Sequence, residues 1–135
     1  MKLIVKTLVS APLEKVWHAY IAPEHIIKWN AASDDWHTTS STVDLRVGGQ
    51  FSARMEAKDG SFGFDFAGTY TNILDQQRIE YAFLNDRTAR IDFTALPNGI
   101  EVRVEFDAEE THSLDQQQQG WQAILDNFSR YVQSI

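Results

Sequence analysis

The sequence predicts an α+β fold in which a curved antiparallel sheet of six to seven strands wraps around a long C-terminal helix. Three observations predict it: a series of segments with alternating apolar and polar residues, short turns between them, and one amphipathic segment at the end of the chain. The 135 residues fit one domain, 1–135, which is long enough to bury a core. We therefore expect the apolar face of the sheet to pack against the terminal helix.

The chain is expected to begin with a strand over residues 2–9 and to continue with two short helices. Pro12 and Pro23 each stand where a helix can begin, because proline lacks the backbone donor that is unpaired in a first helical turn. Apolar residues at helical spacing follow Pro12, and the second helix is expected to end near Trp29. The small and polar residues of segment 30–42 predict a loop.

Alternating segments predict the remaining strands. A short one is expected at Val43, Leu45 and Val47, and five longer ones follow it. Their apolar side chains share one face and their charged side chains the other, which is typical of an antiparallel sheet with one wet face. Asp59-Gly60 and Asn98-Gly99 predict two of the tight turns. The residues expected on the apolar face are Phe51, Ala53, Met55, Ala57, Phe62, Phe64, Phe66, Tyr70, Ile79, Tyr81, Phe83, Ala89, Ile91, Phe93, Ala95, Ile100, Val102, Val104 and Phe106.

The C-terminal segment is expected to cover this apolar face. Ser113 and Gln116 stand in the Ser-x-x-Gln spacing of a capping box, which predicts that a helix begins there. Apolar residues then recur at steps of 3 and 4, and the helix would be roughly 33 Å long at 1.5 Å per residue. The apolar stripe consists of Trp121, Ile124, Leu125, Phe128, Tyr131 or Val132, and Ile135.

Composition excludes several classes of partner. The formal net charge is −7, the isoelectric point is near 4.9, and the basic residues are scattered, so the sequence predicts no nucleic-acid partner. No apolar run approaches the roughly 20 residues that a bilayer span needs, so no membrane insertion is expected. Cysteine is absent, which fits a reducing compartment, and we expect a cytoplasmic protein.

No motif in the sequence indicates a catalytic residue, a metal site or a cofactor. His18, His25, His37 and His112 are isolated and show none of the spacings typical of zinc ligands. Neither a G-x-S-x-G elbow nor a Ser-His-Asp order is present. Gly48-Gly49 lacks the spacing of a phosphate-binding loop and predicts a turn that enters a strand. The carboxylates expected on the wet face are Asp65, Glu80, Asp92, Glu101 and Glu105.

Four segments resemble those of a known family. They are Ala11-Pro12-x-x-x-Val16-Trp17, Pro23-Glu24 to Trp29, Asp44-Leu45-Arg46-Val47-Gly48-Gly49, and Gln119-Gly120-Trp121-x-x-Ile124-Leu125-x-Asn127-Phe128. In this order, and over essentially the whole chain, they resemble the START-like (SRPBCC) helix-grip superfamily. Within it the chain looks like the AHSA-type family, named after the C-terminal domain of the activator of the ninety-kilodalton heat-shock-protein ATPase. The resemblance implies a sheet of seven strands that grips a long helix and encloses a ligand cavity, as in plant pollen allergens and lipid-transfer domains.

The leading functional hypothesis is the binding of a small hydrophobic molecule, such as a lipid, a fatty acid or an aromatic metabolite, between the helix and the sheet. The small residues Ala53, Ala89 and Ala95 favour an open cavity, whereas the alternative is that aromatic side chains simply fill the core. The polar contacts for a ligand would be the hydroxyl groups of Tyr70 and Tyr81 and the polar groups of Trp29, Trp36 and His37. The residues predicted to line the cavity are Trp29, Trp36, Phe51, Met55, Phe64, Tyr81, Phe93, Trp121, Leu125 and Phe128.

Two other functions are open. The family resemblance implies a possible chaperone partner whose ATPase the protein would stimulate. In that family the activator carries an additional N-terminal domain, and this chain, whose strand begins at Leu3, is expected to lack it. Some START-like relatives resemble polyketide cyclases or hydrolases, and in such an enzyme Tyr81 or His37 would be the best proton donor or acceptor.

Overall fold

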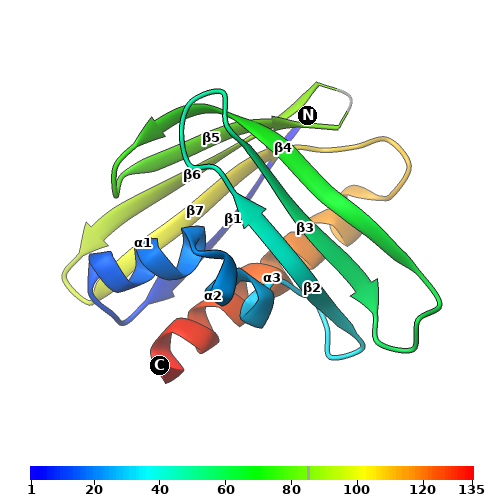
Figure 1. Ribbon diagram of the computed structural model, residues 1–135. Coiled ribbons are helices and arrows are strands. Elements are labelled where there is room, and N and C mark those ends of the chain that lie inside the picture. Colours follow the sequence, from blue (N-terminus) through cyan, green and yellow to red (C-terminus); the bar gives the residue numbers. More distant parts are fainter. Residues whose placement is uncertain (85) are drawn as a thin grey trace.

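The computed structural model describes residues 1–84 and 86–135 and contains a seven-stranded antiparallel sheet and three helices (Figure 1). The order of strands across the sheet is β1-β7-β6-β5-β4-β3-β2. The strands are β1 (Lys2–Val9), β2 (Trp36–Val43), β3 (Gln50–Ala57), β4 (Gly63–Leu74), β5 (Arg78–Phe83), β6 (Arg87–Leu96) and β7 (Gly99–Asp107). The helices are α1 (Leu13–Ile21), α2 (Pro23–Trp29) and α3 (Leu114–Ser134).

The sheet is a meander from β2 to β7, and β1 adds to its far edge beside β7. The pairing of β1 with β7 runs without interruption from Lys2 opposite Asp107 to Val9 opposite Ile100. The sheet curves around α3, while α1 and α2 lie near the C-terminal end of that helix (Figure 1). The predicted α+β class, with a long terminal helix held by a curved sheet, is confirmed.

Helix α3 begins at the predicted capping box. The Ser113 side chain accepts a hydrogen bond from the Gln116 backbone N–H at 3.1 Å, and the Gln116 side chain accepts one from the Ser113 N–H. Along its length α3 is fastened to β1, because Ser129 Oγ donates to the Leu8 carbonyl at 3.1 Å and the Gln122 amide donates to that of Lys6 at 3.0 Å. These bonds place the helix over one side of the sheet.

The two faces of the sheet differ as the alternation predicts. On β5 and β7 every second residue is buried, and the most deeply buried of these, Val102 and Phe106, have 0% of their surface exposed. The opposite face carries ion pairs such as Arg78 Nε to Asp92 Oδ1 at 2.6 Å. Burial of the apolar face under α1 and α3 stabilises the fold, since each large apolar side chain removed from water contributes about 1.5–3 kcal/mol.

Segment 30–42 is not the loop that its composition predicts. Its second half forms β2, an edge strand that pairs only with β3 and therefore needs no apolar alternation. Thr38 alone in this strand is deeply buried, and its hydroxyl donates to the Asn30 carbonyl at 2.6 Å. The prediction of a separate short strand at Val43, Leu45 and Val47 is also wrong, because β2 ends at Val43 and a turn follows.

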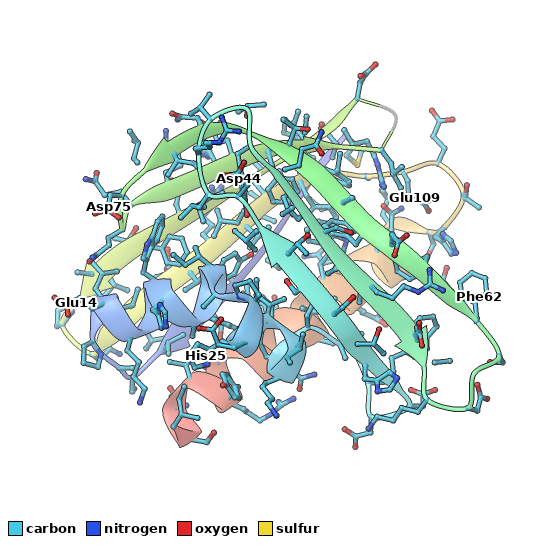
Figure 2. All side chains as sticks on the ribbon, viewed as in Figure 1. Glu14, His25, Asp44, Phe62, Asp75 and Glu109 are labelled. Carbon is cyan, nitrogen blue, oxygen red and sulfur yellow. The ribbon has the colours of Figure 1, made fainter. Side chains whose placement is uncertain are left out.

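Three residues expected on the apolar face, Phe62, Phe64 and Ala95, are exposed instead. Phe62 precedes β4 at the outer end of the β3–β4 hairpin and is 63% exposed (Figure 2). Ala95 lies near the end of β6 and is exposed as well. No helix in the described part of the chain combines the length and the apolar character needed to cross a bilayer.

Candidate functional site

A cavity of about 240 Å³ lies between the concave face of the sheet and the helices. Residues from α1, α2 and α3 contribute to its wall, as do residues from six of the strands. No charged side chain is present among the described residues that line it. Its volume exceeds the roughly 150 Å³ of an apolar cavity that holds benzene and is below the 300 Å³ at which drug-sized sites begin. The space therefore suits a small and mainly apolar molecule.

The structure brings together most of the residues that the sequence predicts for the cavity. Trp121 and Leu125 enter from α3, and Phe64 stands at a partly open position on β4, where it is 39% exposed. The predicted residues that line the cavity are Trp29, Phe51, Met55, Phe64, Tyr81, Trp121 and Leu125.

Three of the predicted residues lie outside the cavity. Phe93 and Phe128 are buried in the adjoining core, where both pack edge-on against Tyr20. Trp36 begins β2 and packs against Phe62 and Phe64, with ring centroids 6.0 Å apart in each pair. The alternation correctly places Phe93 on the apolar face, but it does not tell which part of that face the helices cover closely.

Some residues that line the cavity were not predicted to do so. Tyr20, at the end of α1, and Phe66, on β4, both border the cavity. Both residues belong to apolar stripes in the sequence, and this pattern was the signal that could have predicted their place in the cavity wall. Of the small residues expected to leave space, Ala53 lines the cavity, whereas Ala89 is buried without lining it.

One wall of the cavity depends on the absence of a side chain at Gly68. Phe51 on β3 stands opposite Gly68 on β4 in the sheet register. A Cβ atom at Gly68 would lie 2.8 Å from the Phe51 ring and 2.6 Å from the Ala82 carbonyl oxygen. The glycine therefore lets the Phe51 ring lie flat across β4, where it contacts Tyr81 at a centroid distance of 4.8 Å and Tyr70 at 5.2 Å.

The turn between β2 and β3 is fastened to β4 beside Tyr70. The Gly48 N–H donates to the Tyr70 carbonyl at 2.8 Å, and the Tyr70 N–H donates to the Gly49 carbonyl at 2.9 Å. Gly48 has φ of +85°, which favours glycine, and a Cβ at Gly49 would lie 2.1 Å from the Asp44 carbonyl oxygen. The Gly48-Gly49 turn therefore positions a cavity tyrosine, and Asp44 lies on the same turn (Figure 2).

The polar groups of the cavity wall include three tyrosine hydroxyls. Burial, with a smaller effect of Asp44, raises the pKa of Tyr70 to about 12. Burial also raises the pKa of Tyr20, and it holds that of Tyr81 well above its ordinary value. All three phenols are therefore neutral near pH 7, where they act as hydrogen-bond donors and acceptors rather than as bases.

The predicted carboxylates lie away from the cavity. Asp92 and Glu105 form ion pairs with Arg78, Arg90 and Arg103 on the convex face, and Glu80 accepts a hydrogen bond from Asn72 at 2.7 Å. His37 on β2 does not line the cavity. No group of three or more metal-binding side chains occurs in residues 1–84 and 86–135. The cavity thus offers shape, apolar surface and neutral hydrogen bonds.

Comparison with solved structures shows the same architecture elsewhere. The solution structure of the AHSA1-like protein from Aeromonas hydrophila is 48% identical, with a TM-score of 0.93 over 99% of this chain and 93% of that one. A protein from Cytophaga hutchinsonii is 41% identical, with a TM-score of 0.81 over 98% and 91% of the two chains. A Nitrosomonas europaea protein at 20% identity and a TM-score of 0.81, over 99% and 95%, shares the fold.

No curated protein matches the sequence significantly. The family model described as "Activator of Hsp90 ATPase homolog 1-like protein" matches residues 10–133, which includes α1, α2, all of α3 but its last residue, and all strands after β1. The match extends over most of the wall of the cavity described above. The chain therefore belongs to the Activator of Hsp90 ATPase homolog 1-like family, within the START-like helix-grip fold.

Proposed function

We propose that the protein binds a small hydrophobic molecule in the cavity between the sheet and α3. The observation that carries this proposal is the apolar, uncharged wall around a volume of about 240 Å³. In a well-packed domain, voids larger than a water molecule are few, and a cavity of this size reduces the stability of the unliganded fold, which favours a binding role for it. Its volume favours a single chain or a fused-ring aromatic molecule over a two-chain lipid.

The test is a thermal-shift screen with a panel of small aromatic and aliphatic molecules. A ligand at a hundredfold excess over its Kd is expected to stabilise the folded protein by about 2.7 kcal/mol, which raises Tm by several degrees. Native mass spectrometry of freshly purified protein gives an independent measurement, because a co-purified molecule would appear as a mass adduct.

A blocking variant assigns the binding to this cavity. Ile124→Trp places a larger side chain into the space from α3, whereas Gln119→Trp adds the same side chain at an exposed position of the same helix. We expect Ile124→Trp to abolish the ligand-dependent rise in Tm and Gln119→Trp to retain it. A panel without effect on Tm, or equal rises in both variants, contradicts the proposal.

A chaperone-interacting module, which stimulates a heat-shock ATPase, is the second candidate. The family match over residues 10–133 favours it, because the family is described by that activity. A pull-down with the cell's own ninety-kilodalton chaperone, followed by an ATPase assay, separates the two functions. Binding together with an increased ATPase rate would support this candidate, and the absence of both would eliminate it.

A further inference from the structure

Three tyrosines from distant parts of the sequence meet in the wall of the cavity. Tyr20 lies in the last turn of α1, Tyr70 lies on β4 and Tyr81 lies on β5. Tyr70 and Tyr81 stand directly opposite each other in the sheet register, and each is more than nine-tenths buried. Both rings contact the Phe51 ring, at centroid distances of 5.2 Å and 4.8 Å, and both border the same cavity.

The hydroxyl groups of these tyrosines lack partners in the protein. Within residues 1–84 and 86–135, none of the three makes a hydrogen bond, and burial and neighbouring charges account for their raised pKa values without one. Tyr131 differs, because its hydroxyl lies 2.6 Å from His25 Nδ1 outside the cavity. Among the described residues, the fully enclosed side-chain polar atom without a partner is Arg90 Nε, so the three phenol oxygens are open to the space of the cavity, where a ligand oxygen can hydrogen-bond to them.

We propose that Tyr20, Tyr70 and Tyr81 form the polar end of the cavity and bind the carbonyl or hydroxyl oxygen of a neutral ligand whose remainder is apolar. This inference rests on the proposed function and adds the chemical class of the ligand. A phenol both donates and accepts, so either kind of oxygen is suited to it.

The cavity disfavours an anionic ligand of the same size. None of its described lining residues is a lysine, an arginine or a histidine. A carboxylate that enters would lose its hydration and would gain only neutral donors, with no positive charge to compensate. The inference therefore separates neutral alcohols, phenols and ketones from the fatty acids and other acids of similar shape.

Matched naphthalene derivatives test the inference by isothermal titration calorimetry at pH 7. The probes are 2-naphthol, 2-methylnaphthalene and 2-naphthoate, which share one ring system and differ in the substituent. Tyr20→Phe, Tyr70→Phe and Tyr81→Phe each remove one hydroxyl and keep the ring, and Tyr131→Phe is the control outside the cavity.

We expect the cavity variants to weaken naphthol binding by roughly three- to tenfold relative to methylnaphthalene, since one neutral hydrogen bond is lost. Tyr131→Phe is expected to leave that ratio unchanged. Naphthoate is expected to bind at least about tenfold more weakly than naphthol. The cavity variants are also expected to keep the Tm of the unliganded protein, because no protein hydrogen bond is lost.

The outcomes distinguish this inference from the proposed function. If neither neutral probe binds the wild-type protein, the proposed cavity function is overturned. If both bind, but the naphthol-to-methylnaphthalene ratio is the same in the wild type and in all three cavity variants, only the inference about the tyrosines is overturned. Naphthoate binding as tight as that of naphthol would also overturn it.

Discussion

Two parts of one sheet bury their apolar faces to different degrees. In the packed half, formed by β1, β6 and β7, side chains such as Val9, Ile91 and Phe106 have 0% of their surface exposed, and among the described residues this half contributes only Val5 and Val104 to the cavity wall. In the cavity half, formed by β2, β3 and β4, Phe64 is 39% exposed and Phe51 and Phe66 border open space. The alternation of residues in β3 and β4 is similar to that in β6 and β7. The two halves differ in how α3 lies over them. Its side chains hydrogen-bond to β1, at the edge of the packed half.

The placement of a helix therefore decides whether an apolar face becomes core or cavity. The packed half supplies the stability that lets the other half remain partly empty. Substitutions in the two halves should therefore have different consequences for stability and for binding.

The largest effect is expected from Phe106→Ala in the packed half. Phe106 is fully buried and stacks on Trp121 at a centroid distance of 3.9 Å. Truncation of a buried phenylalanine to alanine costs about 3–5 kcal/mol of the free energy of unfolding, which urea unfolding measures. A loss below about 1 kcal/mol would show that this half is not closely packed.

Gly49→Ala is expected to reduce the free energy of unfolding by about 2 kcal/mol, because the added Cβ collides with the Asp44 carbonyl and displaces the turn beside Tyr70. Gly120→Ala is the matched control. Among the described residues, no atom apart from the chain neighbours and the nearby backbone of α3 lies within 4 Å of a Cβ at Gly120, so this substitution should stabilise the protein by up to about 1 kcal/mol. Equal changes in the two variants would contradict the role of the turn.

Met55→Ala in the cavity half should lower the free energy of unfolding clearly less than Phe106→Ala does. Truncation of a buried methionine to alanine in a close-packed core lowers the free energy of unfolding by about 2–5 kcal/mol. Met55, however, borders the cavity and already lacks neighbours on one side. We expect a loss of about 1–2 kcal/mol by urea unfolding. A loss as large as that of Phe106→Ala would mean that this half is packed like the other.

The smallest effect concerns the edge of the packed half. Asp107 pairs with Lys2 at 2.8 Å and accepts hydrogen bonds from Thr88, and the Lys2 bond is the main reason that its pKa falls to about 2. Because the folded pKa is below the unfolded value of about 3.9, the carboxylate stabilises the fold above pH 4. That contribution is lost as the pH falls towards 2.

Asp107→Asn should therefore lower the free energy of unfolding by less than about 1 kcal/mol at pH 6, as is usual for a surface ion pair. The difference between the variant and the wild type should diminish at pH 2.5, measured by urea unfolding at both values. If the wild type and the variant differ in free energy of unfolding by the same amount at both pH values, the ion pair of the Asp107 carboxylate and its hydrogen bonds do not cause that difference.

The sequence was sufficient to predict most elements of the fold, because their signals are local. Pro12, Pro23 and the Ser113–Gln116 capping box mark helix starts, and the alternation marks β3 to β7. Strand β2 escaped prediction, since an edge strand of serine and threonine residues needs no apolar face. Its content of Thr38, Thr42 and Val43, which favour strands, was the available signal.

The cavity was less predictable than the fold. Alternation identifies Phe93 and Phe51 equally as inward residues, yet one packs against Trp17 and the other lines the cavity. The difference depends on where α1 and α3 lie, which is a property of tertiary packing. The meeting of Tyr20 with Tyr70 and Tyr81 depends on the same placement, so spacing in the sequence could not show it.

Methyl NMR during a ligand titration tests directly whether a ligand binds in the cavity half of the sheet and leaves the packed half unchanged. With 2-naphthol added, we expect the methyl signals of the lining residues Met55, Ile79 and Leu125 to shift in proportion to occupancy. Those of Val9 and Val16 in the packed core should remain in place. Shifts spread equally over both sets, or confined to the packed core, would contradict the division of the sheet into a packed half and a ligand-binding half.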